Sequence, residues 1–157
     1  MIDPDTFRSV LGRFASGVTI VTMRDADGGD HGMTVSAFSS VSLEPPLILI
    51  CVDHAASMHD LLVARPAFGV SILSAEQEAY SRRFADAEDD RFDGIAYVRG
   101  ESGVVLLEDA LAHLECHAVE RFEAGDHTII VAAVERAEPR HGRPLLYYRG
   151  GYAQLER

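Results

Sequence analysis

The stretch GMTVSAFSSVSLEPPLILICV, residues 32–52, decides the fold that we expect. Its second half, Leu47–Val52, is an unbroken apolar run after two prolines, and this pattern predicts a strand buried on both faces. Its first half is rich in small hydroxyl side chains, at Thr34, Ser36, Ser39, Ser40 and Ser42. Hydroxyls beside a core strand, together with nearby backbone N–H groups, suit a ligand with many acceptors, such as a flavin or a phosphate. A solvated serine-rich loop between two strands is the alternative.

On the N-terminal side of this stretch, the sequence predicts a helix and a hairpin. Asp3-Pro4 has the pattern of an N-cap followed by proline at the first helical position, and Gly17 is expected to end the helix. β-Branched residues over 18–23 predict a strand, and DADGGD at 25–30 predicts a hairpin turn before a second strand that begins near His31. The helix has one apolar face, formed by Phe7, Val10, Leu11 and Phe14.

On the C-terminal side, we expect four more strands and two short helices. The strands cover residues 67–73, 111–122, 128–134 and 145–148. Ser57 is expected to cap a helix that Pro66 ends, and Ser74 with Gln77 has the spacing of a capping box for a helix toward Phe84. The segment 86–93, DAEDDRFD, is expected to be an exposed acidic loop.

Six or more strands, three short helices and no βαβ alternation predict a mainly β protein. The expected architecture is a closed antiparallel barrel with helices at its ends, and not a doubly wound parallel sheet. A chain of 157 residues without a linker or a repeat fits one domain, residues 1–157.

Charge and cysteine content exclude several partners. Fourteen Lys and Arg against 25 Asp and Glu give a formal charge of −11, which repels nucleic acid and anionic lipid. Cys51 and Cys116 both lie in apolar, strand-like settings and are expected to be buried thiols. The sequence has no basic-then-apolar N-terminal segment and no apolar run of about 18 residues, so we expect a cytoplasmic protein.

The common catalytic and metal-binding motifs are also missing from the sequence. It has no phosphate-binding glycine loop, no zinc-spaced histidines and cysteines, and no nucleophile elbow. His113 and His117 are four apart, but on a strand that spacing spans about 13 Å. We therefore assign no metal ligand and no catalytic nucleophile. A cofactor with its own reactivity fits better, because hydride transfer from a nicotinamide to a flavin requires stacked rings and exclusion of water.

Five segments resemble the flavin reductase-like family. These small FMN-binding split-barrel enzymes supply reduced flavin to two-component monooxygenases. The segments are FRSVLGRFASGVTIVT (7–22), GMTVSAFSSVSLEPPLILICVD (32–53), SRRFA (81–85), GDHTIIVAAV (125–134) and PLLYYRGGY (144–152). The resemblance covers nearly the whole chain, in the family's order. It implies an antiparallel FMN-binding split barrel, a homodimer with flavin near the interface, FMN or FAD as cofactor, NADH or NADPH as co-substrate, and a separate oxygenase component.

The resemblance also implies where the flavin lies. Residues 34–37 run along the isoalloxazine ring, and the regions 51–57 and 81–85 approach the ribityl-phosphate end. The candidate flavin-binding residues are Met33, Thr34, Val35, Ser36, Ala37, Ser40, Val41, Ser42, Cys51, Val52, Asp53, Ser57, His59, Arg83, Phe84 and Ala85. Arg82 and Arg83 suit a phosphate, and a solvated helix face is the alternative. The loop HAASMHD departs from the family, whose members often carry Ser and Thr together there.

Four further residues are implied near the nicotinamide: His127, Tyr148, Gly150 and Tyr152. The alternatives are a turn histidine bonded to backbone and an aromatic pair that closes the barrel. The leading hypothesis is an NAD(P)H:flavin oxidoreductase. The alternatives are a flavin-binding or electron-carrier protein without turnover and a split-barrel oxidase of the kind that oxidises pyridoxamine phosphate, for which the chain lacks extra basic residues. The sequence does not distinguish FMN from FAD or NADH from NADPH.

Overall fold

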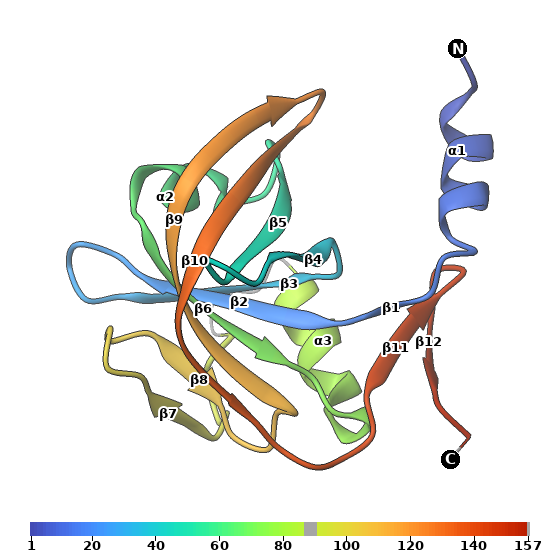
Figure 1. The fold of residues 1–157 in the computed structure, drawn as a ribbon. Helices are drawn as coiled ribbons and strands as arrows, with labels where there is room; N and C mark the ends of the chain where they lie inside the picture. The colour runs from blue at the N-terminus through green and yellow to red at the C-terminus, as the bar shows by residue number, and fades with distance from the viewer. Residues whose placement is uncertain (87–90, 157) are drawn as a thin grey trace.

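The computed structural model describes residues 1–86 and 91–156, and within them the main sheet has seven strands (Figure 1). All neighbouring strands in it are antiparallel. Their order is β3 (Asp30–Val35), β2 (Thr19–Arg24), β6 (Ala67–Ile72), β9 (Ala112–Ala124), β10 (His127–Pro139), β5 (Leu47–Asp53) and β4 (Phe38–Ser42). The two outermost strands, β3 and β4, are separated in the chain only by residues 36–37, so the sheet curls into a barrel. The predicted mainly β, antiparallel fold is confirmed.

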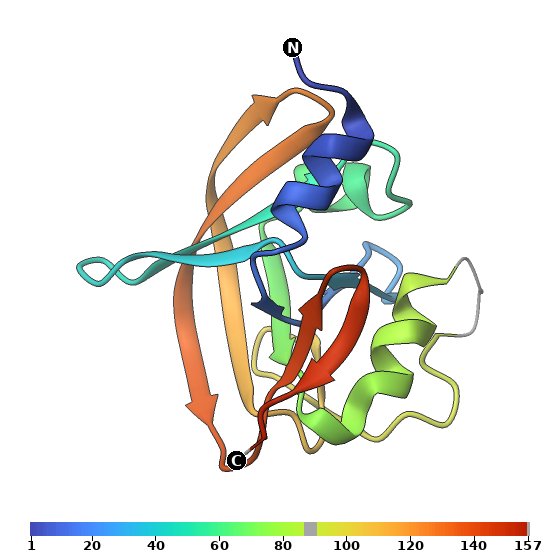
Figure 2. The ribbon, with the colours of Figure 1, turned by 90° about the vertical axis from the view of Figure 1, so that its right-hand side faces the viewer.

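A smaller sheet beside the barrel joins the two ends of the chain (Figures 1 and 2). It contains β1 (Ser16–Gly17), β11 (Leu145–Tyr148) and β12 (Gly151–Gln154). Helix α1 (Pro4–Leu11) begins as predicted, because the Asp3 carboxylate accepts a hydrogen bond from the Thr6 backbone N–H. It ends at Leu11 and not at Gly17, because residues 16 and 17 pair with β11 as a strand.

The barrel has two apolar cores that share β2. Val21 and Met23 lie in one core with Ile50 and Ile130, whereas Ile20 lies in the other core. On β5, Ile48, Ile50 and Val52 are buried, but the alternate residues Leu47, Leu49 and Cys51 are only half-buried. The expectation that this strand is buried on both faces is therefore wrong for the single chain.

Of the two predicted N-terminal signals of the short helices, one is wrong and one is confirmed. Helix α2 (His59–Ala64) has Met58 at its N-cap, without a side-chain cap, so the prediction that Ser57 caps it is wrong. The capping box is confirmed, since the Ser74 backbone N–H donates to Gln77 Oε1 at 3.0 Å. It opens a 3-10 turn, η1 (Ala75–Gln77), which continues as α3 (Glu78–Ala85). Of the acidic segment 86–93, residues 87–90 lie outside the described residues.

A hairpin that was not predicted, β7 (Tyr97–Arg99) and β8 (Val105–Leu107), accompanies an unexpected buried carboxylate on β9. Glu115 is buried. Its carboxylate accepts two hydrogen bonds from Ser102, one from the backbone N–H at 2.9 Å and one from the side-chain hydroxyl at 2.7 Å. Ser102 lies between β7 and β8, so this carboxylate ties the hairpin turn to the barrel wall.

Both cysteines are free thiols, Cys116 buried and Cys51 half-buried. Burial raises the pKa of the Cys116 thiol to about 12 and also raises that of Cys51. Both therefore stay protonated at neutral pH. Within residues 1–86 and 91–156, no helix has the length and apolar character needed to span a membrane.

Candidate functional site

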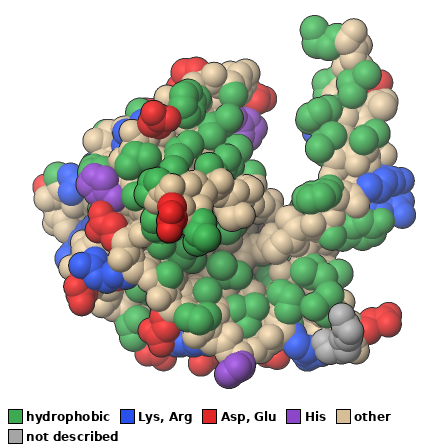
Figure 3. Space-filling view, viewed as in Figure 1, with side chains coloured by type: hydrophobic (Ala, Val, Ile, Leu, Met, Phe, Trp, Pro, Cys, Tyr) green, Lys and Arg blue, Asp and Glu red, His purple; other side chains and the backbone are tan. Residues whose placement is uncertain are grey.

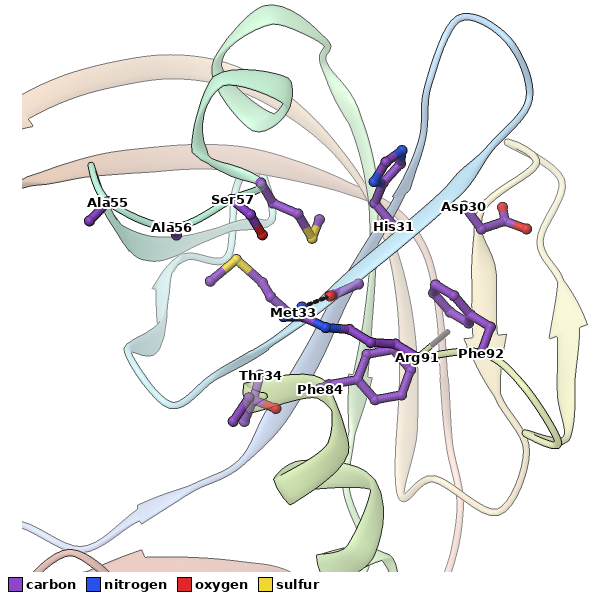
Figure 4. A pocket seen from close by; sticks show the side chains of 13 residues that line it. Asp30, His31, Met33, Thr34, Ala55, Ala56, Ser57, Phe84, Arg91 and Phe92 are labelled. Atoms are coloured by element: carbon purple, nitrogen blue, oxygen red, sulfur yellow. Dashed lines mark hydrogen bonds between the residues drawn. The ribbon is translucent and has the colours of Figure 1, made fainter. Parts of the chain in front are cut away.

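A cavity of about 750 Å³ lies between β3, the loop after β5 and the end of α3 (Figure 4). Its volume is in the range of cofactor sites. Its lining consists of Asp30, His31, Gly32, Met33, Thr34, Ala55, Ala56, Ser57, Met58, Phe84, Ala85, Arg91 and Phe92. Three segments far apart in sequence therefore form one site that mixes apolar, hydroxyl and charged side chains.

An aromatic pair packs closely against β3 in this site. The rings of Phe84 and Phe92 meet edge-to-face, with centroids 5.1 Å apart. A Cβ on Gly32 would lie 2.7 Å from Phe84 Cε1 and 3.0 Å from Phe92 Cζ, so only glycine admits both rings at this distance. The Gly32 in the stretch that decides the fold thus also shapes the cavity.

A smaller cavity of about 190 Å³ adjoins the first, since Thr34 and Ala85 line both. Its other lining residues are Val18, Ser36, Ser81, Tyr147 and Tyr152. Thr34 Oγ1 donates to the Ser81 carbonyl at 2.6 Å, and the hydroxyls of Ser81 and Tyr152 share a hydrogen bond of 2.7 Å. These contacts tie β3, α3 and β12 together around the smaller cavity.

The predicted residues divide between the cavities and the strands around them. Lining one or both cavities are Met33, Thr34, Ser36, Ser57, Phe84, Ala85 and Tyr152. Val35 and Val52 have buried side chains in the core. The remaining predicted flavin-binding residues are not in either lining. They are Ala37, Ser40, Val41, Ser42, Cys51, Asp53, His59 and Arg83, and Ser40 and Val41 are exposed on β4.

Three arginines lie near α3, and they differ in what they contact. Arg82 binds Glu78 at 2.9 Å, and its guanidinium lies 4.8 Å above the Tyr152 ring. Arg83 donates to the Asp93 carbonyl. Arg91 lines the larger cavity and donates to the Gly32 carbonyl at 2.6 Å and to the Asp86 carbonyl. Sequence reasoning missed Arg91, although a lone basic residue followed by Phe92 within an acidic segment was a usable signal.

The predicted nicotinamide residue His127 is the first residue of β10 and pairs with Asp53 of β5. Its Nδ1 lies 2.7 Å from the Asp126 carboxylate, and its side chain is 40% exposed. The hydrogen bond to His127 lowers the pKa of Asp126, so that carboxylate is ionised at neutral pH. This contact uses Nδ1, and His127 belongs to neither cavity lining.

A hydrogen-bond network holds the loop that lines the larger cavity. His59 Nε2 lies 2.8 Å from Thr128 Oγ1, and that hydroxyl donates to Glu123 at 3.0 Å. The other Glu123 oxygen lies 2.7 Å from His54 Nε2. The hydrogen bonds from Thr128 and His54 lower the pKa of Glu123. Residues 54 and 59 flank Ala55–Met58, so the network fixes both ends of this wall.

The other predicted nicotinamide residues, Tyr148 and Gly150, lie at the turn between β11 and β12 and are exposed. Gly150 has φ +76°, the left-handed region that favours glycine. Among the described residues, no three His, Cys, Asp or Glu side chains are placed to hold a metal ion.

Relatives of this chain among known proteins are described as flavin reductases or as reductase subunits. The model of the flavin reductase like domain matches residues 11–156. An NADH-dependent flavin reductase of a Rhodococcus species is 44% identical over 99% of this chain and 88% of that protein. The reductase subunit of a flavin-dependent monooxygenase from Mycobacterium tuberculosis is 37% identical over 99% of this chain and 84% of that subunit.

A solved structure extends the likeness to the fold. It is the NADH:FAD oxidoreductase of Streptomyces globisporus in complex with NAD and FAD fragments. It superposes with a TM-score of 0.92 at 42% identity and covers 99% of this chain and 96% of that one. The predicted family, the split-barrel fold class and the enzyme class, an oxidoreductase that reduces flavin, are confirmed. The chain belongs to the flavin reductase-like family.

Proposed function

We propose that this protein transfers a hydride from NADH to a flavin, FMN or FAD, held in the larger cavity, and that the reduced flavin serves a separate oxygenase. The observation that carries this proposal is the cavity itself, where β3, the loop Ala55–Met58 and the end of α3 meet. NADH is preferred to NADPH because relatives are named as NADH-dependent. The oxygenase is inferred from relatives that are reductase components of two-component systems.

The residues present fit a flavin. The hydroxyls of Ser36 and Ser57, with the backbone N–H groups beside them, can donate to the acceptor-rich polar edge of the isoalloxazine ring, whereas the Thr34 hydroxyl already donates to the Ser81 carbonyl. Phe84 covers one side of the cavity and keeps water away, and Arg91 supplies a positive charge. Bound flavin supplies the hydride acceptor, and the protein binds, orients and shields it. We assign positioning of the nicotinamide to His127 at the start of β10, and we propose Tyr148, Gly150 and Tyr152 of the β11–β12 hairpin as further contacts.

We further propose that the protein is a homodimer, because α1 has an apolar face that its own chain leaves exposed. Phe7, Val10 and Leu11 on this helix, and Phe14 just beyond its end, are each more than half exposed. Figure 3 shows hydrophobic side chains along α1 where it faces the barrel across an open gap. A helix of 8 residues is not stable on its own in water, so it needs a partner surface. The half-buried outer face of β5 offers another apolar surface for a second copy.

The family model spans residues 11–156, which supports our proposal that residues 1–157 form one domain. The acidic net charge of −11 supports small molecules and proteins as partners in place of nucleic acid or membranes. We propose the cytoplasm as the site of action because NADH is supplied there.

Steady-state oxidation of NADH and NADPH, each with riboflavin, FMN and FAD, tests the proposed activity. We expect rapid NADH oxidation that depends on flavin, and slower oxidation of NADPH because its 2′-phosphate requires a further cation. No oxidation with any of the three flavins would refute the reductase activity and favour a flavin-binding protein without turnover.

The substitution His127→Ala is expected to raise the KM for NADH and to lower catalytic efficiency roughly 5- to 30-fold, because one hydrogen bond to the bound nicotinamide is lost. Flavin affinity, measured by fluorescence titration, should stay nearly unchanged. The matched control is His117→Ala, which removes an exposed histidine on the neighbouring strand β9. Loss of flavin binding with normal NADH kinetics would place His127 at the flavin instead.

A further inference from the structure

We propose that Thr128 is a positioning residue of the flavin site. Its buried hydroxyl holds His59, and through His59 it fixes the loop Ala55–Met58, which forms one wall of the larger cavity. The proposal rests on the proposed function. Thr128 is the second residue of β10, is 1% exposed and lines neither the larger nor the smaller cavity. Its hydroxyl can therefore affect flavin binding only through other residues.

The hydrogen bonds of Thr128 have a fixed direction. Its hydroxyl has one hydrogen, which it donates to Glu123 Oε1 at 3.0 Å. His59 Nε2 lies 2.8 Å from the same hydroxyl oxygen, so this nitrogen carries a hydrogen and donates it to Thr128. The hydrogen bond from Thr128 is also the main cause that lowers the pKa of Glu123, which is ionised at neutral pH. The carboxylate therefore orients the hydroxyl, and the hydroxyl orients the His59 ring.

His59 is placed to pass this order on to the loop. It is the first residue of α2, directly after Met58, and its side chain is only 13% exposed. Its backbone N–H donates to the Ala56 carbonyl at 3.0 Å. Its ring meets the His54 ring edge-to-face, with centroids 5.0 Å apart, and the His54 backbone N–H donates to the Asp126 carbonyl at 2.9 Å. The His59 ring therefore contacts the residue before the loop as well as closing its far end.

The loop itself has few contacts that could replace this support. Ala55 and Ser57 are exposed, and only Met58 is buried within it. Figure 4 shows Ala55, Ala56 and Ser57 along this side of the cavity. A wall that flavin must order on binding gives weaker binding than one already held in place. The contact between Thr128 and His59 thus raises flavin affinity without touching the flavin.

Thr128→Val tests the proposal, because valine keeps the branched shape and suits a strand but leaves the His59 donor without its acceptor. The dissociation constant for FMN, measured by fluorescence titration, should rise roughly 5- to 50-fold, as expected for one buried hydrogen bond left unmade. The KM for NADH at saturating FMN should stay within about twofold, because β10 still pairs with β5 and His127 keeps its contact with Asp126. Thr128→Ser retains the hydroxyl and should bind FMN within about threefold of the wild type.

Ser71→Ala is the matched control for the loss of a buried hydroxyl. Ser71 is 0% exposed, accepts a hydrogen bond from the Leu107 backbone N–H at 3.0 Å and lines neither of these cavities. It should lower the melting temperature about as much as Thr128→Val and leave the FMN dissociation constant within about twofold. A Thr128→Val protein that melts earlier but binds FMN as the wild type does would show a role in the fold alone and refute the proposal. Failure of Thr128→Ser to recover FMN affinity would also refute it.

His59→Phe tests the same contact from the other side, and it carries the test if Thr128→Val does not fold. Phenylalanine keeps a planar ring but cannot donate to Thr128. We expect a loss of FMN affinity similar to that of Thr128→Val, and a double variant within about twofold of the weaker single variant, because both substitutions remove one contact. Wild-type affinity in His59→Phe, or losses that multiply in the double variant, would overturn the proposal. Wild-type protein that binds FMN but does not oxidise NADH would refute the proposed activity alone, since binding is measured without NADH.

Discussion

Phe84→Ala is expected to lower the free energy of unfolding by about 3–5 kcal/mol and to abolish measurable flavin binding. Phe84 is buried in the second core, and it packs edge-to-face on Phe92 and against the backbone of Gly32. Truncation removes core contacts and one wall of the 750 Å³ cavity at once. Chemical denaturation measures the first effect, and fluorescence titration with FMN measures the second.

Phe84→Leu is the matched control for this substitution, because it keeps an apolar wall of similar volume. It should cost less than about 1.5 kcal/mol and retain flavin binding. If Phe84→Ala had the stability and the flavin affinity of the wild type, the end of α3 would not form the wall of the flavin site.

The double substitution Val10→Asp and Phe14→Asp is expected to convert the homodimer into monomers. Val10 lies on the exposed apolar face of α1, and the exposed Phe14 lies just beyond the end of this helix. In a dimer they would be buried, and an unpaired buried charge costs several kcal/mol, so the dissociation constant should rise by at least about 10³-fold. Sedimentation velocity over a range of protein concentrations measures this change.

Ser9→Asp adds a charge to the opposite side of the same helix and should leave the dimer intact. A double variant that still sediments as a dimer would show that another surface, and not α1, joins the subunits. Wild-type protein that sediments as a monomer at full activity would refute the homodimer itself.

Much of the barrel could be predicted from the sequence because its signals are local. Three of these signals act within a few residues: the Asp3 cap, the capping box of Ser74 and Gln77, and the apolar run of β5. The cap and the box form as expected, and the apolar run forms a strand, although only one of its faces is fully buried. The end of α1 could not be found this way. The apolar spacing continues to Phe14, but pairing of residues 16 and 17 with β11, more than a hundred residues away, decides where the helix gives way to a strand.

The short strands were harder to predict for a related reason. β7 and β8 have three residues each and β12 has four, too few for alternation to stand out from a loop. The burial of Glu115 could not be predicted for a different reason. A carboxylate in an alternating strand predicts an exposed position, but the turn at Ser102 supplies its donors in the interior.

The sequence indicated which segments approach the cavities, but it did not distinguish the residues that line them from their neighbours. The hydroxyl-rich stretch does lead into the cavity at Thr34, yet curling of the sheet places Ser40 and Val41 outside the lining. Arg91 lies in a segment of mostly acidic residues, which predicts an exposed loop. Its position in the cavity wall is seen from its hydrogen bond to the Gly32 carbonyl. Which arginine faces a cavity depends on tertiary contacts that sequence spacing does not encode.

Anaerobic mixing of the protein with FMN and NADH tests directly whether the protein transfers a hydride to flavin, with the visible absorbance of oxidised flavin as the readout. We expect wild-type protein to bleach this absorbance at a rate that saturates with NADH, whereas Phe84→Ala should not accelerate the bleaching. Flavin that binds to the wild-type protein, as shown by titration, and yet stays oxidised in the presence of NADH would refute the proposed hydride transfer.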